Sequence, residues 1–244
     1  MKRGSRPKAI VSWSSGKDSA FALQQIRSTE EFELVGVLTT VTAAFHRVSM
    51  HGVREELLDA QVTALGLPSE KIYIPSPCPN EVYEREMTRV LTGLKRNGVT
   101  HVLFGDLFLQ DIRSYREKQL SQLGLHGIFP LWMRDTAALA REMIDDGIEA
   151  FLTCVDLRKL DASFAGRRFD DDLLRALPAG IDPCGENGEF HTFVSAGPMF
   201  SASIPVRVGE TVQRDGFAFA DLLPVTKSTG SSSKDRPAHE PPRR

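Results

Sequence analysis

The chain contains 244 residues, 41% of them hydrophobic and 25% charged, with 30 basic and 32 acidic residues and a formal net charge of −2. This is the composition of an ordinary globular protein, and the charge provides no global attraction to nucleic acid. No apolar run approaches the roughly 20 residues that cross a bilayer, and the basic N-terminal residues lack the apolar stretch of a signal peptide, so we expect a cytoplasmic protein with no membrane partner.

In the first 135 residues, short apolar strands alternate with amphipathic helices. The apolar runs predict strands at 9–13, 34–38, 71–74 and 101–104, and a short strand or extended segment at 128–132. Helical spacing of apolar residues predicts helices at 19–27, 53–65, 81–95 and 112–123. Alternation of this kind predicts an α/β fold with a parallel sheet built of right-handed βαβ units.

After residue 135 the pattern becomes rich in loops. Thr136 is the predicted N-cap of a helix that runs through Ile144, and strands are expected at 149–155, 190–194 and 205–208. We therefore expect a sheet domain over residues 1–135 and a smaller α+β domain over 136–225, packed on the first. The polar composition of residues 226–244 predicts a disordered tail.

The junction between the first strand and the first helix has the features of a phosphate-binding loop. Gly16 permits a tight turn, and the start of the helix directs backbone N–H groups and the helix dipole toward one point. A nucleotide-binding P-loop is excluded, because Val11 stands where its first glycine would be and Asp18 where its Ser or Thr would be. A Rossmann fingerprint is excluded because Gly16 stands alone.

The six residues Ser14 to Ser19 resemble the PP-loop of ATP-pyrophosphatases, whose pattern is Ser-Gly-Gly-x-Asp-Ser. Ser15 replaces the first glycine, which restricts φ at that position but adds a hydroxyl donor. The resemblance implies cleavage of ATP between its α and β phosphates. The alternative is a capped turn with an incidental lysine. The residues expected to bind ATP are Ser12, Ser14, Ser15, Gly16, Lys17, Asp18, Ser19, Thr39 and Gly105.

A second polar segment follows the strand expected at 101–104. Ligands of open parallel sheets lie at the carboxyl ends of the strands, so Asp106 is expected, together with Asp18, to hold Mg²⁺ or to orient a substrate. Arg113 and Arg116 could bind an anionic substrate group, because guanidinium groups match carboxylates and phosphates. The alternative is that both arginines belong to a solvated helical face.

A third segment, residues 182–192, combines two carboxylates, two glycines and a histidine. Glu186 and Glu189 are candidates for binding a substrate amine or for acting as a base, with a polar hairpin turn as the alternative. His191 is a candidate substrate ligand or a structural histidine. His51 follows the second strand and is expected near the nucleotide or the substrate, unless it caps a helix. The predicted catalytic residues are Lys17, Asp18, Asp106, Glu186 and Glu189.

With Pro130-Leu131-Trp132, these segments make the chain resemble, over residues 8–200, the ATP-binding family that contains diphthine–ammonia ligase. The resemblance implies a nucleotide-alpha-hydrolase (HUP, Rossmann-like) domain, the use of ATP and Mg²⁺, and amidation by ammonia of a carboxylate on a small molecule or a modified residue. Family members usually read Gly-Glu-Gly-Gly-Glu-Tyr-Glu-Thr in the acidic segment, whereas Asn187, Phe190 and His191 stand here. A cysteine that they tend to carry near Gln119 is also missing.

Two other functions stay open at this point. One is an ATP-binding regulatory or sensor module without substantial turnover, although such a module needs no second polar segment. The other is a tRNA-modifying PP-loop enzyme, which usually has paired cysteines and a basic surface. The three cysteines here are far apart in sequence. A homodimer is one option for the assembly.

Overall fold

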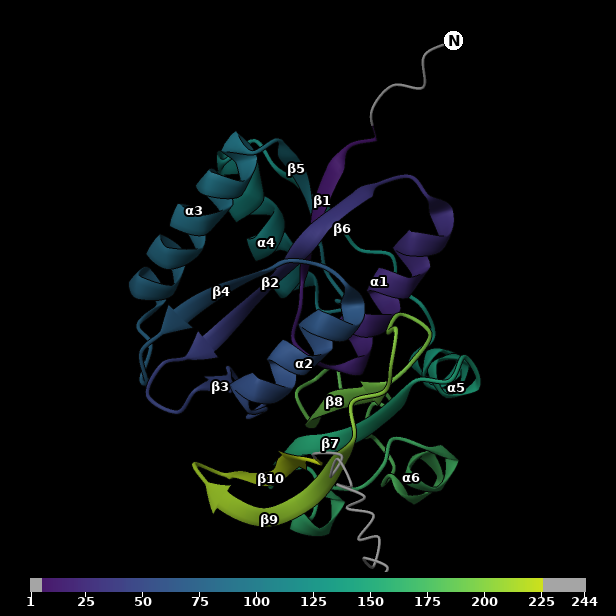
Figure 1. Cartoon of the computed structure of the whole chain (residues 1–244). Coiled ribbons are helices and arrows are strands. Elements are labelled where there is room, and N and C mark those ends of the chain that lie inside the picture. Colours follow the sequence, from purple (N-terminus) through teal and green to yellow (C-terminus); the bar gives the residue numbers. More distant parts are fainter. Residues whose placement is uncertain (1–5, 226–244) are drawn as a thin grey trace, which may run out of the picture.

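The computed structural model describes residues 6–225 and contains two sheets, one above the other in Figure 1. No helix among the described residues has the length and apolar character that crossing a membrane requires. Residues 226–244, predicted to form a tail, lie outside the described residues.

The first sheet is mainly parallel, as predicted. Its parallel strands are β1 (Lys8–Ser12), β2 (Glu33–Thr42), β4 (Ser69–Ile74), β5 (Val99–Leu103) and β6 (His126–Ile128). β1 lies at the centre, between β2 and β5, and β4 and β6 pair on their outer sides. The short β3 (Arg47–Val48) pairs antiparallel with the end of β2. This arrangement brings the carboxyl ends of β1 and β5 side by side.

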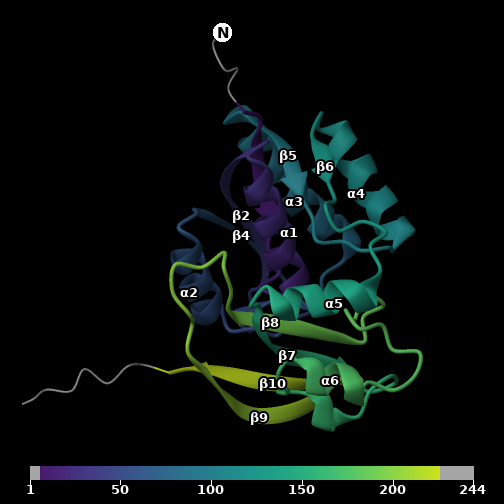
Figure 2. The ribbon, with the colours of Figure 1, turned by 90° about the vertical axis from the view of Figure 1, so that its right-hand side faces the viewer.

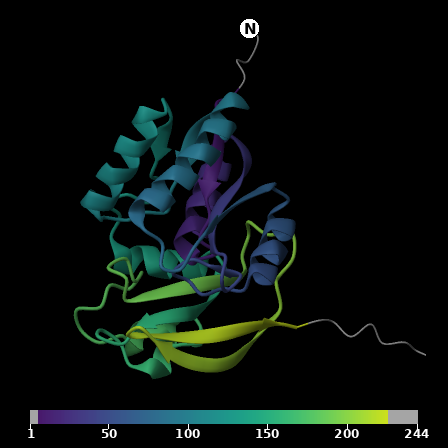
Figure 3. The same cartoon turned by 90° about the vertical axis from the view of Figure 1, so that its left-hand side faces the viewer.

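Two pairs of helices cover the parallel sheet (Figure 1). α1 (Lys17–Thr29) and α2 (Glu55–Leu65) pack on one face, and α3 (Asn80–Arg96) and α4 (Gln110–Gln122) pack on the other. Successive side chains of a strand point to opposite faces, so Val11 joins Phe21 in one core cluster while Ile10 joins Leu91 in the other. Figure 3, in which the left-hand side of Figure 1 faces the viewer, shows α3 and α4 above the green and yellow strands of the second half of the chain.

The second sheet is antiparallel, in the order β8–β7–β10–β9. Its strands are β7 (Glu149–Asp156), β8 (Phe190–Ala196), β9 (Val206–Arg214) and β10 (Phe217–Pro224). α5 (Thr136–Asp145), the 3-10 helix η1 (Ala162–Phe164) and α6 (Asp171–Ala176) belong to the same half of the chain. Figure 2 shows β8 directly below α1, and Phe193 of β8 shares one hydrophobic core with Phe21 of α1. The second sheet thus covers the start of α1.

The structure corrects several local predictions. Asp135, not Thr136, caps α5: its carboxylate accepts a hydrogen bond from the Ala138 amide at 2.7 Å. The predicted extended segment 128–132 is wrong beyond Ile128, because the chain turns after β6. The sequence reading missed β3, α6 and β10. β3 and α6 are too short for a periodic pattern, and the buried positions of β10 include small alanines, which weaken the apolar signal.

Candidate functional site

A cleft of about 210 Å³ lies at the carboxyl ends of β1 and β5, where the parallel sheet meets β8. Ligands of open parallel sheets bind at this edge. The cleft is lined by residues of the PP-loop, of the segment after β5, of the turn before α2 and of the 182–192 segment: Ser12, Ser14, Lys17, Asp18, Ser19, His51, Phe104, Gly105, Asp106, Arg116, Gly185, Glu186, Phe190, His191 and Thr192. All three segments singled out from the sequence therefore contribute to one site.

The PP-loop hydroxyl groups form a compact network at the start of α1. The Ser14 and Ser19 hydroxyl oxygens lie 3.2 Å apart, and the Ser19 hydroxyl donates to the Gly16 carbonyl at 2.9 Å. The Gly16 amide donates to the Ser14 hydroxyl at 3.3 Å. Gly105 must lack a side chain, because a Cβ there would lie 2.6 Å from the carbonyl carbon of Asp18. The segment after β5 therefore lies directly against the loop.

Ser15 occupies the left-handed region of the backbone, with φ of 70°. This is the position at which the PP-loop pattern has glycine, and a residue with a Cβ is strained there. Ser15 is fully buried, its hydroxyl has no hydrogen-bond partner among the described residues, and it does not line the cleft. The structure thus does not bring the predicted Ser15 donor to the ligand.

Lys17 connects the PP-loop to the 182–192 segment. Its nearly buried ammonium group contacts both Asp18 carboxylate oxygens at 3.0 Å and also the Cys184 carbonyl oxygen. Burial alone would lower the pKa of Lys17, but the nearby Asp18, Cys184 and Glu186 raise it. Burial also raises the pKa of Asp18, against the opposing effect of Lys17. Lys17 therefore stays protonated inside the cleft wall.

Asp106 and Arg116 form an imperfect ion pair in the cleft. Oδ2 of Asp106 and Nε of Arg116 are 2.7 Å apart, yet neither atom makes an aligned hydrogen bond within residues 6–225. Burial raises the pKa of Asp106 although the guanidinium groups of Arg116 and Arg113 oppose this. The Arg116 guanidinium also lies 4.5 Å from the ring centre of Phe104. Both charged groups are thus available to rearrange toward a ligand.

The structure places Arg113 away from the cleft. Its guanidinium lies 4.6 Å from the ring centres of both Phe129 and Trp132, and its Nε contacts Glu117 at 2.8 Å. Arg113 is absent from the cleft lining. Of the two arginines predicted to bind substrate, the fold directs only Arg116 to the site.

The two glutamates of the acidic segment have different surroundings. Glu186 lines the cleft, and its carboxylate accepts a hydrogen bond from the Leu107 amide at 2.8 Å. Burial, reinforced by Asp18 and Asp106, raises the pKa of Glu186 to about 7. Glu189 is buried outside the cleft lining and accepts hydrogen bonds from the Asp182 amide and the Asn187 side chain. Glu189 therefore shapes the loop that presents Glu186.

His51 and His191 both line the cleft and form a face-to-face pair, with ring centres 4.5 Å apart and planes tilted by 33°. His51 Nδ1 lies 3.0 Å from the Thr192 carbonyl oxygen, which fixes Nδ1 as the donor and leaves Nε2 as the acceptor. Burial lowers the pKa of His51 to about 4, and burial together with His51 lowers that of His191 well below its usual value. The pair is neutral near pH 7.

The sequence did not point to Thr192, which lines the cleft, or to Gln61, which supports the PP-loop from the core. The Thr192 hydroxyl accepts a hydrogen bond from the Lys17 amide at 3.1 Å, and Gln61 of α2 contacts the Ser15 carbonyl. Thr192 ends the acidic motif and could have been noticed there, whereas no local signal marks Gln61. Thr39, an expected ATP ligand, is buried and donates to the Trp13 carbonyl at 2.8 Å without lining the cleft.

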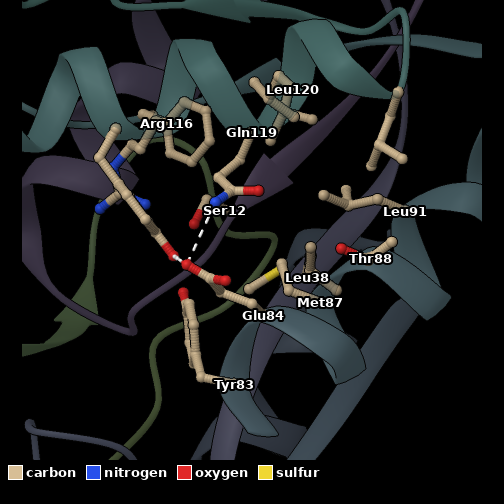
Figure 4. Close-up of a pocket in the computed structure, with 14 residues that line it drawn as sticks. Ser12, Leu38, Tyr83, Glu84, Met87, Thr88, Leu91, Arg116, Gln119 and Leu120 are labelled. Atoms are coloured by element: carbon tan, nitrogen blue, oxygen red, sulfur yellow. Dashed lines mark hydrogen bonds between the residues drawn. The ribbon is translucent and has the colours of Figure 1, made fainter. Parts of the chain in front are cut away.

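A second cavity continues from the cleft between α3 and α4 (Figure 4), sharing Ser12, Phe104 and Arg116 with it. Most of its other walls are apolar side chains: Leu38, Met87, Leu91, Val102, Leu120 and Leu123. Glu84 projects from α3 toward Gln119 in Figure 4, and its carboxylate accepts hydrogen bonds from Gln119 at 3.2 Å and Tyr115 at 3.0 Å. The cavity is therefore an apolar slot with one polar end.

No group of three or more potential metal ligands is preassembled within residues 6–225. Mg²⁺ does not require one, because it is commonly held by one or two carboxylates together with substrate phosphates. Asp18 and Asp106 line the same cleft as the PP-loop. The donor set thus fits a Mg²⁺ ion that arrives with a nucleotide.

Comparison with known proteins places residues 7–127 in the family model described as the diphthamide synthase N-terminal domain and residues 135–222 in that of the diphthamide synthase C-terminal domain. The chain is 28% identical to the diphthine–ammonia ligase of Danio rerio, over 88% of this chain and 92% of that protein. It is 26% identical to the diphthine–ammonia ligase of Homo sapiens, over 74% and 70%. Among solved structures, a predicted subunit of tRNA methyltransferase from Methanocaldococcus jannaschii aligns over 65% of this chain and 84% of that one, with 15% identity and a TM-score of 0.39, too distant a likeness to bear on function.

Proposed function

The chain belongs to the diphthamide synthase family, whose two domain models match it in chain order, and on this premise we propose that it is an ATP-dependent ligase. The enzyme adenylates a substrate carboxylate, releasing pyrophosphate, and then amidates it with ammonia, releasing AMP. One observation carries the proposal: the PP-loop and the acidic 182–192 segment line the same cleft and are joined by Lys17.

ATP is proposed to place its phosphates on residues 14–19. The start of α1 supplies backbone N–H groups and the positive end of the helix dipole, as anion sites require. Lys17 offsets the charge that grows on the departing pyrophosphate. The slot in Figure 4 adjoins Ser12, and its apolar walls suit the flat purine ring. Asp18 and Asp106 would hold Mg²⁺, and the bound ion would neutralise part of the negative charge of the phosphates.

In the first step a carboxylate oxygen of the substrate forms a bond to the α phosphorus as the bond to pyrophosphate breaks. Arg116 is the charged group of the cleft wall that can turn toward that carboxylate, because its contact with Asp106 is poorly aligned. The neutral His51–His191 pair offers further hydrogen bonds on the β8 side of the cleft. The second sheet limits the access of water to the acyl-adenylate.

In the second step the nitrogen of ammonia bonds to the acyl carbon, and the carbon–oxygen bond to AMP breaks with its electron pair leaving on AMP. The nitrogen must then lose a proton. Glu186 is the proposed acceptor, since a base is most effective when its pKa lies near the working pH and the pKa of Glu186 is raised to about 7.

The substrate class follows from the relatives, which are named diphthine–ammonia ligases. A carboxylate on a modified residue of the diphthine type is therefore the first choice, and a small-molecule acid is the second, because Asn187, Phe190 and His191 depart from the usual family motif. Residues 1–135 are assigned to ATP and 136–225 to the substrate. A cytoplasmic location and a homodimer remain predictions.

The proposal is tested by measuring the nucleotide products and the transfer of ¹⁸O from the substrate to AMP in one reaction. The protein is incubated with Mg-ATP, ammonium and a diphthine-bearing substrate whose carboxylate carries ¹⁸O. Adenylation predicts AMP and pyrophosphate in equal amounts, with ¹⁸O in the AMP, because the acyl carbon loses the oxygen that had bonded to phosphorus. Formation of ADP and phosphate, or AMP without ¹⁸O, contradicts the proposal.

A further inference from the structure

Gln61 is a buried polar residue on the inner face of α2, and all its amide atoms have partners. Its exposure is 0%. Its Nε2 donates to the Ser15 carbonyl at 3.1 Å and to the Val194 carbonyl at 2.7 Å, while its Oε1 accepts from the Trp13 indole at 3.0 Å. The three contacts reach the residue that follows β1, the PP-loop and β8. The indole bond also determines the orientation of the amide, since only an oxygen can accept there.

Ser15 needs outside support. With φ of 70° it lies in a region that its Cβ disfavours, and its own buried hydroxyl has no partner within residues 6–225 to compensate. Its carbonyl oxygen instead accepts two hydrogen bonds, from Gln61 and from the Val194 amide at 2.9 Å. Both donors come from outside the loop, so packing rather than local preference maintains this conformation.

The direction of the Ser15 carbonyl determines the direction of the next amide. In a trans peptide the C=O of one residue and the N–H of the next point in opposite directions within one plane. The Ser15 carbonyl faces Gln61 and Val194 in the core, so the Gly16 N–H faces the other way, toward the Ser14 hydroxyl that lines the cleft. Gly16 does not itself line the cleft, so this peptide acts on the cleft through Ser14: rotation would replace the N–H donor to the Ser14 hydroxyl with a carbonyl oxygen.

We propose that Gln61 is a positioning residue that holds the Ser15–Gly16 peptide so that the Gly16 N–H orients the Ser14 hydroxyl of the PP-loop toward pyrophosphate. The inference rests on the proposed function for the identity of the ligand, but the coupling between Gln61 and Ser15 does not depend on any ligand. Serine at a glycine position thus requires the glutamine, and a glycine at position 15 would adopt the same φ without strain.

A double-mutant cycle tests the proposal. Gln61→Met, which keeps side-chain length but removes the amide, is made in the wild-type and Ser15→Gly backgrounds, and the Kd for Mg-pyrophosphate is measured by calorimetry. The expected loss of affinity is about tenfold with Ser15 and about threefold or less with glycine. An equal loss in both backgrounds, or unchanged affinity in folded Gln61→Met, overturns the proposal.

Leu57→Ala is the matched control, because Leu57 is buried on the same helix. It should lower Tm without changing the Kd. If Gln61→Met does not fold, Gln61→Leu replaces it, because leucine is also apolar and donates nothing. Tm is also measured without ligand: Ser15→Gly should raise the Tm of the Gln61 variant more than that of the wild type, and equal shifts overturn the coupling. Wild-type protein that binds no pyrophosphate would refute the proposed function alone.

Discussion

The ammonium group of Lys17 contacts the carbonyl oxygen of Cys184, which lies 167 residues later in the chain. The same ammonium group holds both carboxylate oxygens of Asp18 at 3.0 Å. Lys17, which the PP-loop resemblance predicts to bind phosphate, thus also contacts the 182–192 segment. Lys17 therefore connects the two parts of the site.

Lys17→Met should abolish AMP formation and also loosen the acidic segment, because Asp18 and the Cys184 carbonyl both lose their cation. We expect at least a hundredfold loss of turnover and faster hydrogen exchange over 182–189. Lys159→Met is the matched control, since Lys159 is an exposed lysine that donates to the Asn187 carbonyl in the same segment at 2.7 Å. It should leave turnover unchanged. Unchanged hydrogen exchange over 182–189 in Lys17→Met would show that Lys17 does not stabilise this segment.

Glu186→Gln should stabilise the protein at high pH. The pKa of Glu186 is raised from 4.5 to about 7, so the folded chain binds more protons than the unfolded chain between these values. The contribution of Glu186 to the free energy of unfolding is therefore fully present below pH 4.5 and is lost as the pH rises through 7. The variant should gain about 1–2 kcal/mol in unfolding free energy at pH 8 relative to pH 4, allowing for partial exposure.

Urea unfolding at the two pH values measures that change. Glutamine at 186 can still accept from the Leu107 amide, so the loop contact is retained. Glu117→Gln, on the exposed surface of α4, is the control. If Glu186 accepts the proton, the amidation rate of the wild type should rise as the pH passes through 7, and Glu186→Gln should remove this rise. A rise that persists in Glu186→Gln would exclude Glu186 as the proton acceptor.

His51→Gln should stabilise the protein at low pH, whereas Glu186→Gln stabilises it at high pH. The pKa of His51 is lowered from 6.5 to about 4 by burial, so between these values the unfolded chain binds the additional proton. The wild type therefore loses stability as the pH falls through this window, by about 1–2 kcal/mol that the variant should recover. Unfolding at pH 7.5 and pH 4.5 tests this. His126→Gln, at an exposed side chain of β6, is the comparison variant, and an equal gain there would refute the assignment.

Met87→Trp should separate the purine part of the proposed nucleotide site from its phosphate part. Met87 lines the slot between α3 and α4 (Figure 4), and a larger ring there would occupy the space proposed for the purine. The KM for ATP should rise about tenfold, the scale of a lost apolar contact, while pyrophosphate affinity stays unchanged. Arg85→Trp, on the exposed side of α3, should alter neither value. An equal loss of affinity for ATP and for pyrophosphate would show that the purine does not bind in this slot.

The strands and helices of the first half were predictable because their signal is local. Apolar runs and helical spacing belong to neighbouring residues, and α1, α3 and α4 begin and end within two residues of their predicted bounds. The PP-loop was predictable for the same reason. Ser15 is the exception: serine in place of glycine predicts a restricted φ, yet the structure holds Ser15 in the left-handed region at φ of 70°, with hydrogen bonds from Gln61 and Val194 to its carbonyl.

Spacing within one segment could not determine which polar residues enter the cleft. Arg113 and Arg116 belong to one helix, yet Phe129 and Trp132 hold the first away from the site. Glu186 and Glu189 belong to one loop, yet only Glu186 lines the cleft. The first outcome depends on how the segment after β6 packs on α4, and the second on how the 182–192 segment folds against Leu107 and Asp182. The sequence by itself determined most helices and strands of the first half and the turn between β1 and α1, because those preferences are properties of adjacent residues. The tertiary structure alone decided the burial and partners of each site residue, including Gln61, because segments distant in the chain supply the contacts.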